Sequence, residues 1–89
     1  MDTNMSIFNQ INSLCYWFQH ETHYHCALVL DSEKDSYYIR IKDRGIHLYT
    51  QQISNFSKKS KDLLRIELTS IAESLVLLKG NYVTQKQTA

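Results

Sequence analysis

The residues best suited to chemistry are concentrated in one short segment, CYWFQHETHYHC at positions 15–26. This segment holds both cysteines, three of the four histidines and the single tryptophan of the chain. Cysteine and histidine are common zinc ligands, so the segment has the chemistry for a metal site. The spacing argues against one, because no CxxC or HxxxH pair occurs, and we expect neither a metal nor a cofactor. The side chains considered are Cys15, His20, His23, His25 and Cys26.

Catalysis is a second possibility for this segment, because Cys26 and His25 have the types of a nucleophile and a base. Neighbours on a strand point to opposite faces, however, and cannot reach each other. A chain with two glycines also has no glycine-rich phosphate loop. The nearby carboxylates belong to a polar turn, where solvated acids are ordinary. We therefore expect a protein that is not an enzyme.

Composition limits the class of protein further. The 89 residues suffice for one small domain with a modest core, and 43% hydrophobic content is typical of a globular chain. The formal charge of +1 differs from the strongly basic balance of many nucleic-acid-binding domains. No apolar run reaches the roughly 20 residues of a membrane span, and the first residues lack the features of a signal peptide. We expect a cytoplasmic domain with reduced cysteines and no membrane partner.

The elements that position these side chains follow from the hydrophobic periodicity. Residues 4–19 repeat apolar positions at helical spacing. Residues 24–31, 37–43 and 46–50 have the composition and alternation of three strands, joined by the polar loop SEKDS and a turn at Gly45. In the third strand the alternation predicts Ile46 and Leu48 facing inward and His47 and Tyr49 facing outward.

A second helix is predicted within residues 57–80, where leucine and isoleucine repeat at steps of four and three. Ser57 or Ser60 can cap its start, and Lys79 followed by Gly80 is a typical end. Residues 81–89 are expected to form a flexible polar tail. The predicted core stripe consists of Leu64, Leu68, Ile71, Leu75 and Leu78.

The predicted fold class is α+β. Residues 1–80 form a single small domain of order α-β-β-β-α, in which a three-stranded antiparallel sheet packs against two helices. The side of the sheet away from the helices is then aromatic and weakly basic, which suits recognition of another protein. An ordinary solvated sheet face is the alternative. The candidate partner-binding residues are His23, His25, Val29, Tyr38, Arg40, His47 and Tyr49.

The second helix has more apolar residues than its core stripe requires. The surplus residues are expected to form a homodimer interface, because a two-fold axis lets one surface contact its own copy. The alternative is that the second helix docks deeply on the first helix, with Tyr16 and Trp17 closing the gap. The surplus residues are Leu63, Ile66, Val76 and Leu77.

The segment CALVLDSEKDSYYIRIKDRGIHLY at residues 26–49 resembles the first strands of class I type III secretion chaperones, whose first strand often reads Cys, apolar, Leu, apolar, apolar, Asp. As in that family, one helix precedes the strands and another follows them. The resemblance implies binding of an effector or another protein partner by the sheet, dimerisation near the second helix and no catalysis.

The segment SKKSK at residues 57–61 resembles the lysine cluster that opens the second helix of double-stranded RNA-binding domains, which share the α-β-β-β-α order. That resemblance implies phosphate contacts by Lys58, Lys59 and Lys61, supported by the dipole of the helix N-terminus. A solvated first turn is the alternative. We therefore expect a protein-binding domain that acts as a chaperone, adaptor or inhibitor, with a nucleic-acid-binding module as the second possibility.

Overall fold

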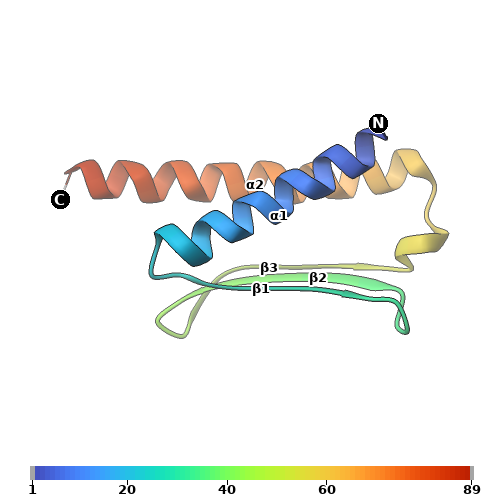
Figure 1. Cartoon of the computed structure of the whole chain (residues 1–89), viewed down its shortest axis with the longest axis horizontal. Coiled ribbons are helices and arrows are strands. Elements are labelled where there is room, and N and C mark those ends of the chain that lie inside the picture. The colour runs from blue at the N-terminus through green and yellow to red at the C-terminus, as the bar shows by residue number, and fades with distance from the viewer. Residues whose placement is uncertain (1, 89) are drawn as a thin grey trace.

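The computed structural model describes residues 2–88 and consists of a sheet covered on one side by two helices (Figure 1). The strands pair antiparallel in the order β1-β2-β3. The α+β fold class and the α-β-β-β-α order are thereby confirmed. The elements are α1 (Thr3–Glu21), β1 (His25–Asp31), β2 (Ser36–Asp43), β3 (Ile46–Ser54), the short 3-10 helix η1 (Phe56–Lys58) and α2 (Lys61–Thr88).

Helix α1 is defined by a polar cap at each end and an apolar face between them. Asp2 caps its start, where the carboxylate Oδ1 accepts a hydrogen bond from the backbone N–H of Asn4 at 3.0 Å. At its end, the Thr22 hydroxyl donates to the carbonyl of Phe18 at 2.6 Å and accepts from the N–H of Tyr24 at 2.9 Å. These bonds turn the chain from the helix into β1.

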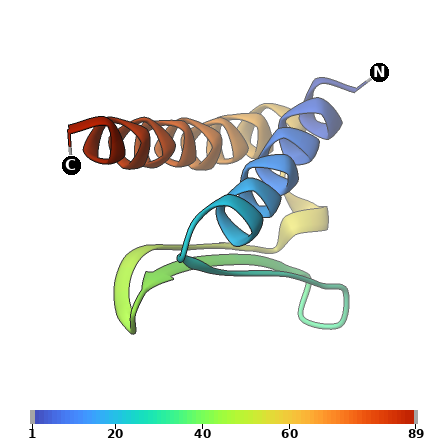
Figure 2. The ribbon, with the colours of Figure 1, turned by 60° about the vertical axis from the view of Figure 1, so that its left-hand side comes forward.

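The core lies between the inner face of the sheet and the two helices. The central strand β2 contributes Tyr37, Ile39 and Ile41, all fully buried, and the helices contribute Phe18 and Leu75 among others. Figure 2 shows both helices above the same side of the sheet, crossing each other at an angle. The opposite side has no covering element among residues 2–88, so it is the open face of the domain.

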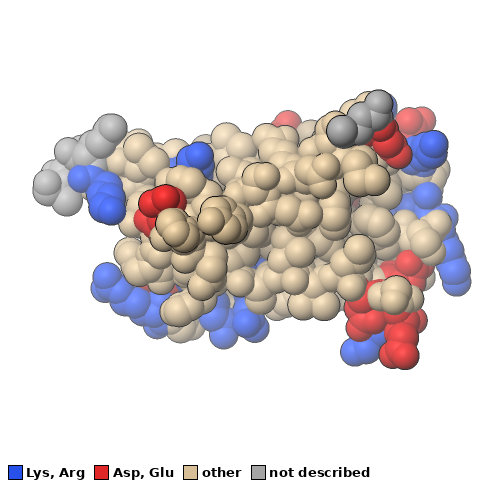
Figure 3. Space-filling view, in the orientation of Figure 1, with Lys and Arg blue, Asp and Glu red and all other residues tan. Residues whose placement is uncertain are grey.

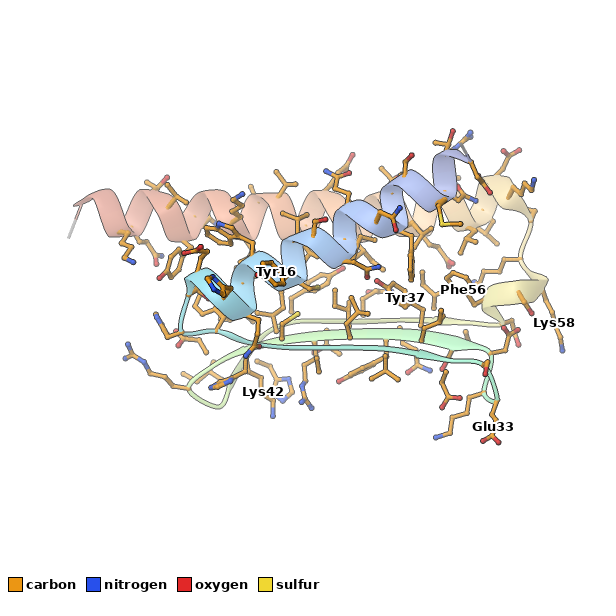
Figure 4. All side chains as sticks on the ribbon, in the orientation of Figure 1. Tyr16, Glu33, Tyr37, Lys42, Phe56 and Lys58 are labelled. Atoms are coloured by element: carbon orange, nitrogen blue, oxygen red, sulfur yellow. The ribbon has the colours of Figure 1, made fainter. Side chains whose placement is uncertain are left out.

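The inner and outer sides of β1 and β2 follow the predicted alternation. Cys26, Leu28 and Leu30 of β1 pair with Ile41, Ile39 and Tyr37 of β2, and this set faces the helices. In Figure 4, Tyr37 points from the sheet toward the helices whereas Lys42 points away from them. The regular alternation of these two strands made their register predictable.

The predicted orientation of β3 is wrong in part. The register between β2 and β3 shifts between Ile41 and Lys42, because Ile41 pairs with Tyr49 and Lys42 pairs with His47. One extra residue, Leu48, is therefore accommodated by a β-bulge, which reverses the alternation beyond it. Tyr49 lies on the inner face, while Ile46 and Leu48 are 66% and 39% exposed. The strand also continues to Ser54, four residues past its predicted end.

Helix α2 begins as predicted but ends later. The hydroxyl of Ser60 accepts a hydrogen bond from the N–H of Leu63 at 3.2 Å, which identifies Ser60 as the cap. The predicted end at Lys79 and Gly80 is wrong, because the helix continues to Thr88. The expected tail at 81–88 is therefore helical, and Ala89 lies outside the described residues. The far end of α2 projects beyond α1 and the sheet in both ribbon views (Figures 1 and 2).

Candidate functional site

The open side of the sheet has four cross-strand rows. The row next to the β1–β2 loop is Asp31–Ser36–Ser54, and we call the other three together the outer sheet face. Side chains paired directly across antiparallel strands lie about 4.5–5.5 Å apart at their Cβ atoms, so each row forms a continuous strip. Strand β2 supplies the middle residue of every row. The rows of the outer sheet face are His25–Lys42–His47, Ala27–Arg40–Thr50 and Val29–Tyr38–Gln52.

The rows change in chemistry along the sheet. The first row contains two imidazoles and an ammonium group, the second a guanidinium, and the third an apolar and an aromatic side chain. No carboxylate occurs in any of the three rows. Val29 is 49% exposed, so its apolar surface is open to contact. The outer sheet face therefore has a basic end and an apolar end.

Charged side chains beyond the rows increase this asymmetry. Arg44 lies in the turn between β2 and β3, next to the basic row, and its side chain is 79% exposed. Past the apolar row lie Asp31, the last residue of β1, and Glu33 in the loop between β1 and β2. In Figure 3, basic side chains gather along the lower left of the molecule and acidic side chains gather at the lower right. The two ends of the sheet thus carry opposite charge.

Five of the seven predicted partner-binding residues lie on the outer sheet face. These are His25, Val29, Tyr38, Arg40 and His47. Sequence reasoning placed Lys42 there too, although without a binding role. It missed Thr50, although this residue lies in the predicted strand, because the bulge at Leu48 reverses the alternation. It missed Gln52 because the polar end of β3 has no alternation of apolar and polar residues to indicate a strand.

Two predicted residues lie elsewhere, and their assignment to the outer sheet face is wrong. His23 precedes β1 and turns toward the helices: its Nε2 lies 3.0 Å from Asp43 Oδ1, and its ring centre lies 6.0 Å from that of Tyr82. Tyr49 faces inward because of the bulge in β3. Burial raises the pKa of the Tyr49 hydroxyl, which agrees with its inner position.

The predicted dimer residues are exposed on α2. Leu63, Ile66, Val76 and Leu77 are 45%, 62%, 49% and 68% exposed. The alternative that these residues are internal is wrong for the single chain, and Tyr16, expected to close a gap above them, is itself 70% exposed. Four large apolar side chains on one helix thus stay in water in the monomer.

The lysine cluster is only partly available to an anion. Lys58 and Lys61 are exposed at the start of α2, but Lys59 Nζ lies 2.9 Å from Glu67 Oε1. Asp35 accepts hydrogen bonds from the N–H and hydroxyl of Ser57 at 2.9 and 2.8 Å, which brings a carboxylate beside the lysines. Lys58 and Glu33 lie at the same end of the molecule in Figure 4. The local acids therefore offset part of the positive charge.

The cysteines lie on the inner side of the sheet, away from the outer sheet face. Cys15 is buried on α1, and its thiol is hydrogen-bonded with that of Cys26. This hydrogen bond, together with burial, raises the pKa of Cys15, which makes it a poor nucleophile. Within residues 2–88, no three His, Cys, Asp or Glu side chains come together as a metal site.

Within the described residues, no helix has both the length and the apolar character needed to cross a membrane. The resemblances to class I type III secretion chaperones and to double-stranded RNA-binding domains stay predictions. The chain matches no family model, no curated protein and no solved structure.

Proposed function

We propose that this chain is a non-enzymatic protein-binding domain whose outer sheet face contacts the partner. The role would be that of a chaperone, adaptor or inhibitor acting in the cytoplasm. The observation that carries the proposal is the set of three uncovered rows, in which apolar, aromatic and basic side chains adjoin without an intervening carboxylate.

The composition of these rows suits a protein partner. Tyrosine and arginine are enriched at protein interfaces, because they combine a large apolar surface with polar groups that can hydrogen-bond. Tyr38 and Arg40 occupy the central strand, half-buried between neighbours on both sides. Such flanked side chains lose less conformational freedom on binding than side chains at a free edge.

Charge indicates the chemistry of the partner. Arg40 and Lys42 are cations with no carboxylate in their rows. Arg44 lies just beyond them, with its Nε 3.7 Å from Asp43 Oδ1. A partner segment that joins acidic residues to an apolar side chain would complement this surface: its acids would meet the basic end, and its apolar residue would meet Val29 and Tyr38. Complementary charge increases the association rate and excludes partners of like charge.

A pair of matched charge reversals tests the proposal. The double variant Arg40→Glu, Lys42→Glu reverses the basic end of the outer sheet face. The control, Lys58→Glu with Lys61→Glu, makes the same change in net charge at the opposite end of the molecule (Figure 4). Each protein carries a photo-crosslinking residue in place of Tyr38, is crosslinked in a lysate of its native host, and is analysed with and without nuclease.

We expect the wild type and the control to crosslink to the same acidic protein in the presence of nuclease, and the Arg40–Lys42 variant to lose it. Recovery of that protein by all three chains would contradict a role for the basic end. Loss of every crosslink on nuclease treatment, or loss only in the control, would indicate nucleic-acid binding instead. Circular dichroism verifies that each variant is folded.

A further inference from the structure

Helix α2 has a second stripe of exposed residues, partly apolar, on the side opposite its buried stripe. Its members are spaced by three, four, three, four and three residues, which is the a/d pattern of a coiled coil. With 3.6 residues per turn, they lie opposite the buried positions Leu68, Ile71 and Leu75. We call these residues the α2 outer stripe: Leu63, Ile66, Ser70, Glu73, Leu77 and Gly80.

Gly80 is the most informative member of this stripe. A glycine inside a helix destabilises it relative to alanine, and a compensating reason is expected where one occurs. Nothing among residues 2–88 requires glycine here, because a Cβ atom built on Gly80 meets no atom within 4 Å. Its helical backbone has no positive φ either. A close neighbour from outside the chain would supply the reason.

We propose that two copies of this chain associate through their α2 outer stripes as an antiparallel helix pair. The stripe is complementary to itself in one register. Ile66 of each copy packs against Leu77 of the other, and Ser70 lies opposite Glu73. The Leu63 side chain of each copy packs into the space beside Gly80 of the other copy, where no side chain is present. The two-fold axis then passes between residues 71 and 72, and each contact occurs twice.

Other antiparallel registers fit less well. Shifting one helix by a heptad in one direction sets Leu63 against Glu73 and leaves Leu77 without an apolar partner. Shifting it in the other direction sets Glu73 against Leu77 and Gly80 against Ser70. Only the proposed register pairs the two most exposed apolar residues of α2, Ile66 and Leu77, and sets the largest free space opposite a leucine. Antiparallel pairing also aligns the helix dipoles favourably.

Glu73 supplies the specificity of this interface rather than its affinity. It is the one charged member of the α2 outer stripe. In the pair, Glu73 of each copy lies opposite the hydroxyl of Ser70 of the other copy. The two Glu73 carboxylates lie in adjacent layers near the axis, where like charges repel. Replacing Glu73 with leucine should therefore strengthen association, whereas an exposed surface position without a partner would show no such response.

A reciprocal exchange of large and small residues tests the register. Gly80→Leu should weaken dimerisation by about tenfold or more, since two leucines then compete for one space. The same substitution should raise the helix content of the monomer, because leucine is a far better helix former than glycine. The compensating double variant Leu63→Ala, Gly80→Leu should restore the dimer, since the large residue has only changed sides. Sedimentation equilibrium measures all three.

Disulfide trapping tests the orientation. A mixture of an Ile66→Cys chain and a Leu77→Cys chain should yield the mixed disulfide. The Ile66→Cys chain alone should not crosslink, because its two copies lie about 16 Å apart along the pair. A wild type that stays monomeric up to about 1 mM, a double variant that stays as weak as Gly80→Leu, or crosslinking of Ile66→Cys with itself would overturn the proposal. The test is independent of the outer sheet face.

Discussion

Lys79 of α2 places its ammonium nitrogen 4.6 Å from the centre of the Trp17 ring on α1. A cation over an aromatic face is attracted to its electron density, and Trp is the preferred ring. This contact occurs at the position where the sequence suggested that α2 ends. One turn further along, the ring of Tyr82 meets the same indole edge-on, with ring centres 5.9 Å apart. Together these contacts stabilise the helix beyond Gly80.

Removing Tyr82 should therefore shorten the helix. Its ring also contacts that of Tyr24, with centres 5.2 Å apart, so Tyr82→Ala deletes two edge-on aromatic pairs. We expect a loss of about 1–3 kcal/mol in the free energy of unfolding, and faster amide exchange over residues 81–88. Hydrogen exchange measured by NMR checks both. Val83→Ala, at a more exposed neighbour, is the control and should leave the exchange over residues 81–88 unchanged.

Equal protection of residues 81–88 in the wild type and in Tyr82→Ala would show that helix propensity alone extends α2. The sequence could not reveal this extension, because it depends on contacts between residues far apart in the chain. Lys79, Gly80 and a polar segment are a typical local signal for a helix end. Tertiary contacts with Trp17 and Tyr24 override that signal.

The same contrast between local pattern and long-range contact explains why the orientation of β2 was predicted correctly and that of β3 only in part. Strand β2 is central, so its inner residues Tyr37, Ile39 and Ile41 alternate strictly, and the fold class followed from them. In β3 a single extra residue, Leu48, reversed the alternation and placed Tyr49 on the wrong side. No pattern of apolar residues in the sequence indicates a bulge of this kind. The outer sheet face was predictable for β1, β2 and His47 of β3, but not for the part of β3 beyond the bulge.

The cap of α2 gives a local prediction. Ser60→Ala removes the acceptor for the N–H of Leu63, and we expect the free energy of unfolding to fall by about 1 kcal/mol. Ser60→Asp should restore the stability, because a carboxylate accepts the same bond and favours the positive end of the helix. Urea denaturation of the three proteins measures this. Equal stability of Ser60→Ala and wild type would mean that another group satisfies the N–H.

The lysines near the start of α2 give a prediction on nucleic acid. We expect duplex RNA and DNA to bind weakly or not at all, because Glu67 pairs with Lys59 and Asp35 lies beside the cluster. Gel-shift titrations at low and high salt check this, since phosphate contacts weaken steeply with salt. Tight, salt-sensitive binding that Lys58→Glu with Lys61→Glu abolishes would contradict our expectation. The variant spares Lys59, whose ammonium group is paired with Glu67.

Tyr37 gives a prediction that depends on pH. Its side chain is fully buried, and its hydroxyl has no hydrogen-bond partner among the described residues. Burial raises the pKa of this hydroxyl, so the folded chain holds the proton more tightly than the unfolded chain does. The resulting stability is fully present below about pH 10, the ordinary value for tyrosine, and is lost as pH rises above it.

Tyr37→Phe should therefore act in two ways. At pH 8 it removes an unpaired buried hydroxyl while retaining the ring contacts with Phe8 and Phe56, and we expect a gain of about 1 kcal/mol in the free energy of unfolding. Above pH 10 the wild type loses stability faster, so the advantage of the variant widens. The pKa values of Tyr24 and Tyr49 are also raised by burial. These two residues therefore cause part of the loss in the free energy of unfolding at alkaline pH in both proteins. Urea denaturation at pH 8 and in alkaline buffer measures the two effects, with Tyr16→Phe as the exposed control. A variant less stable than the wild type at pH 8 would mean that the Tyr37 hydroxyl is stabilised within the core.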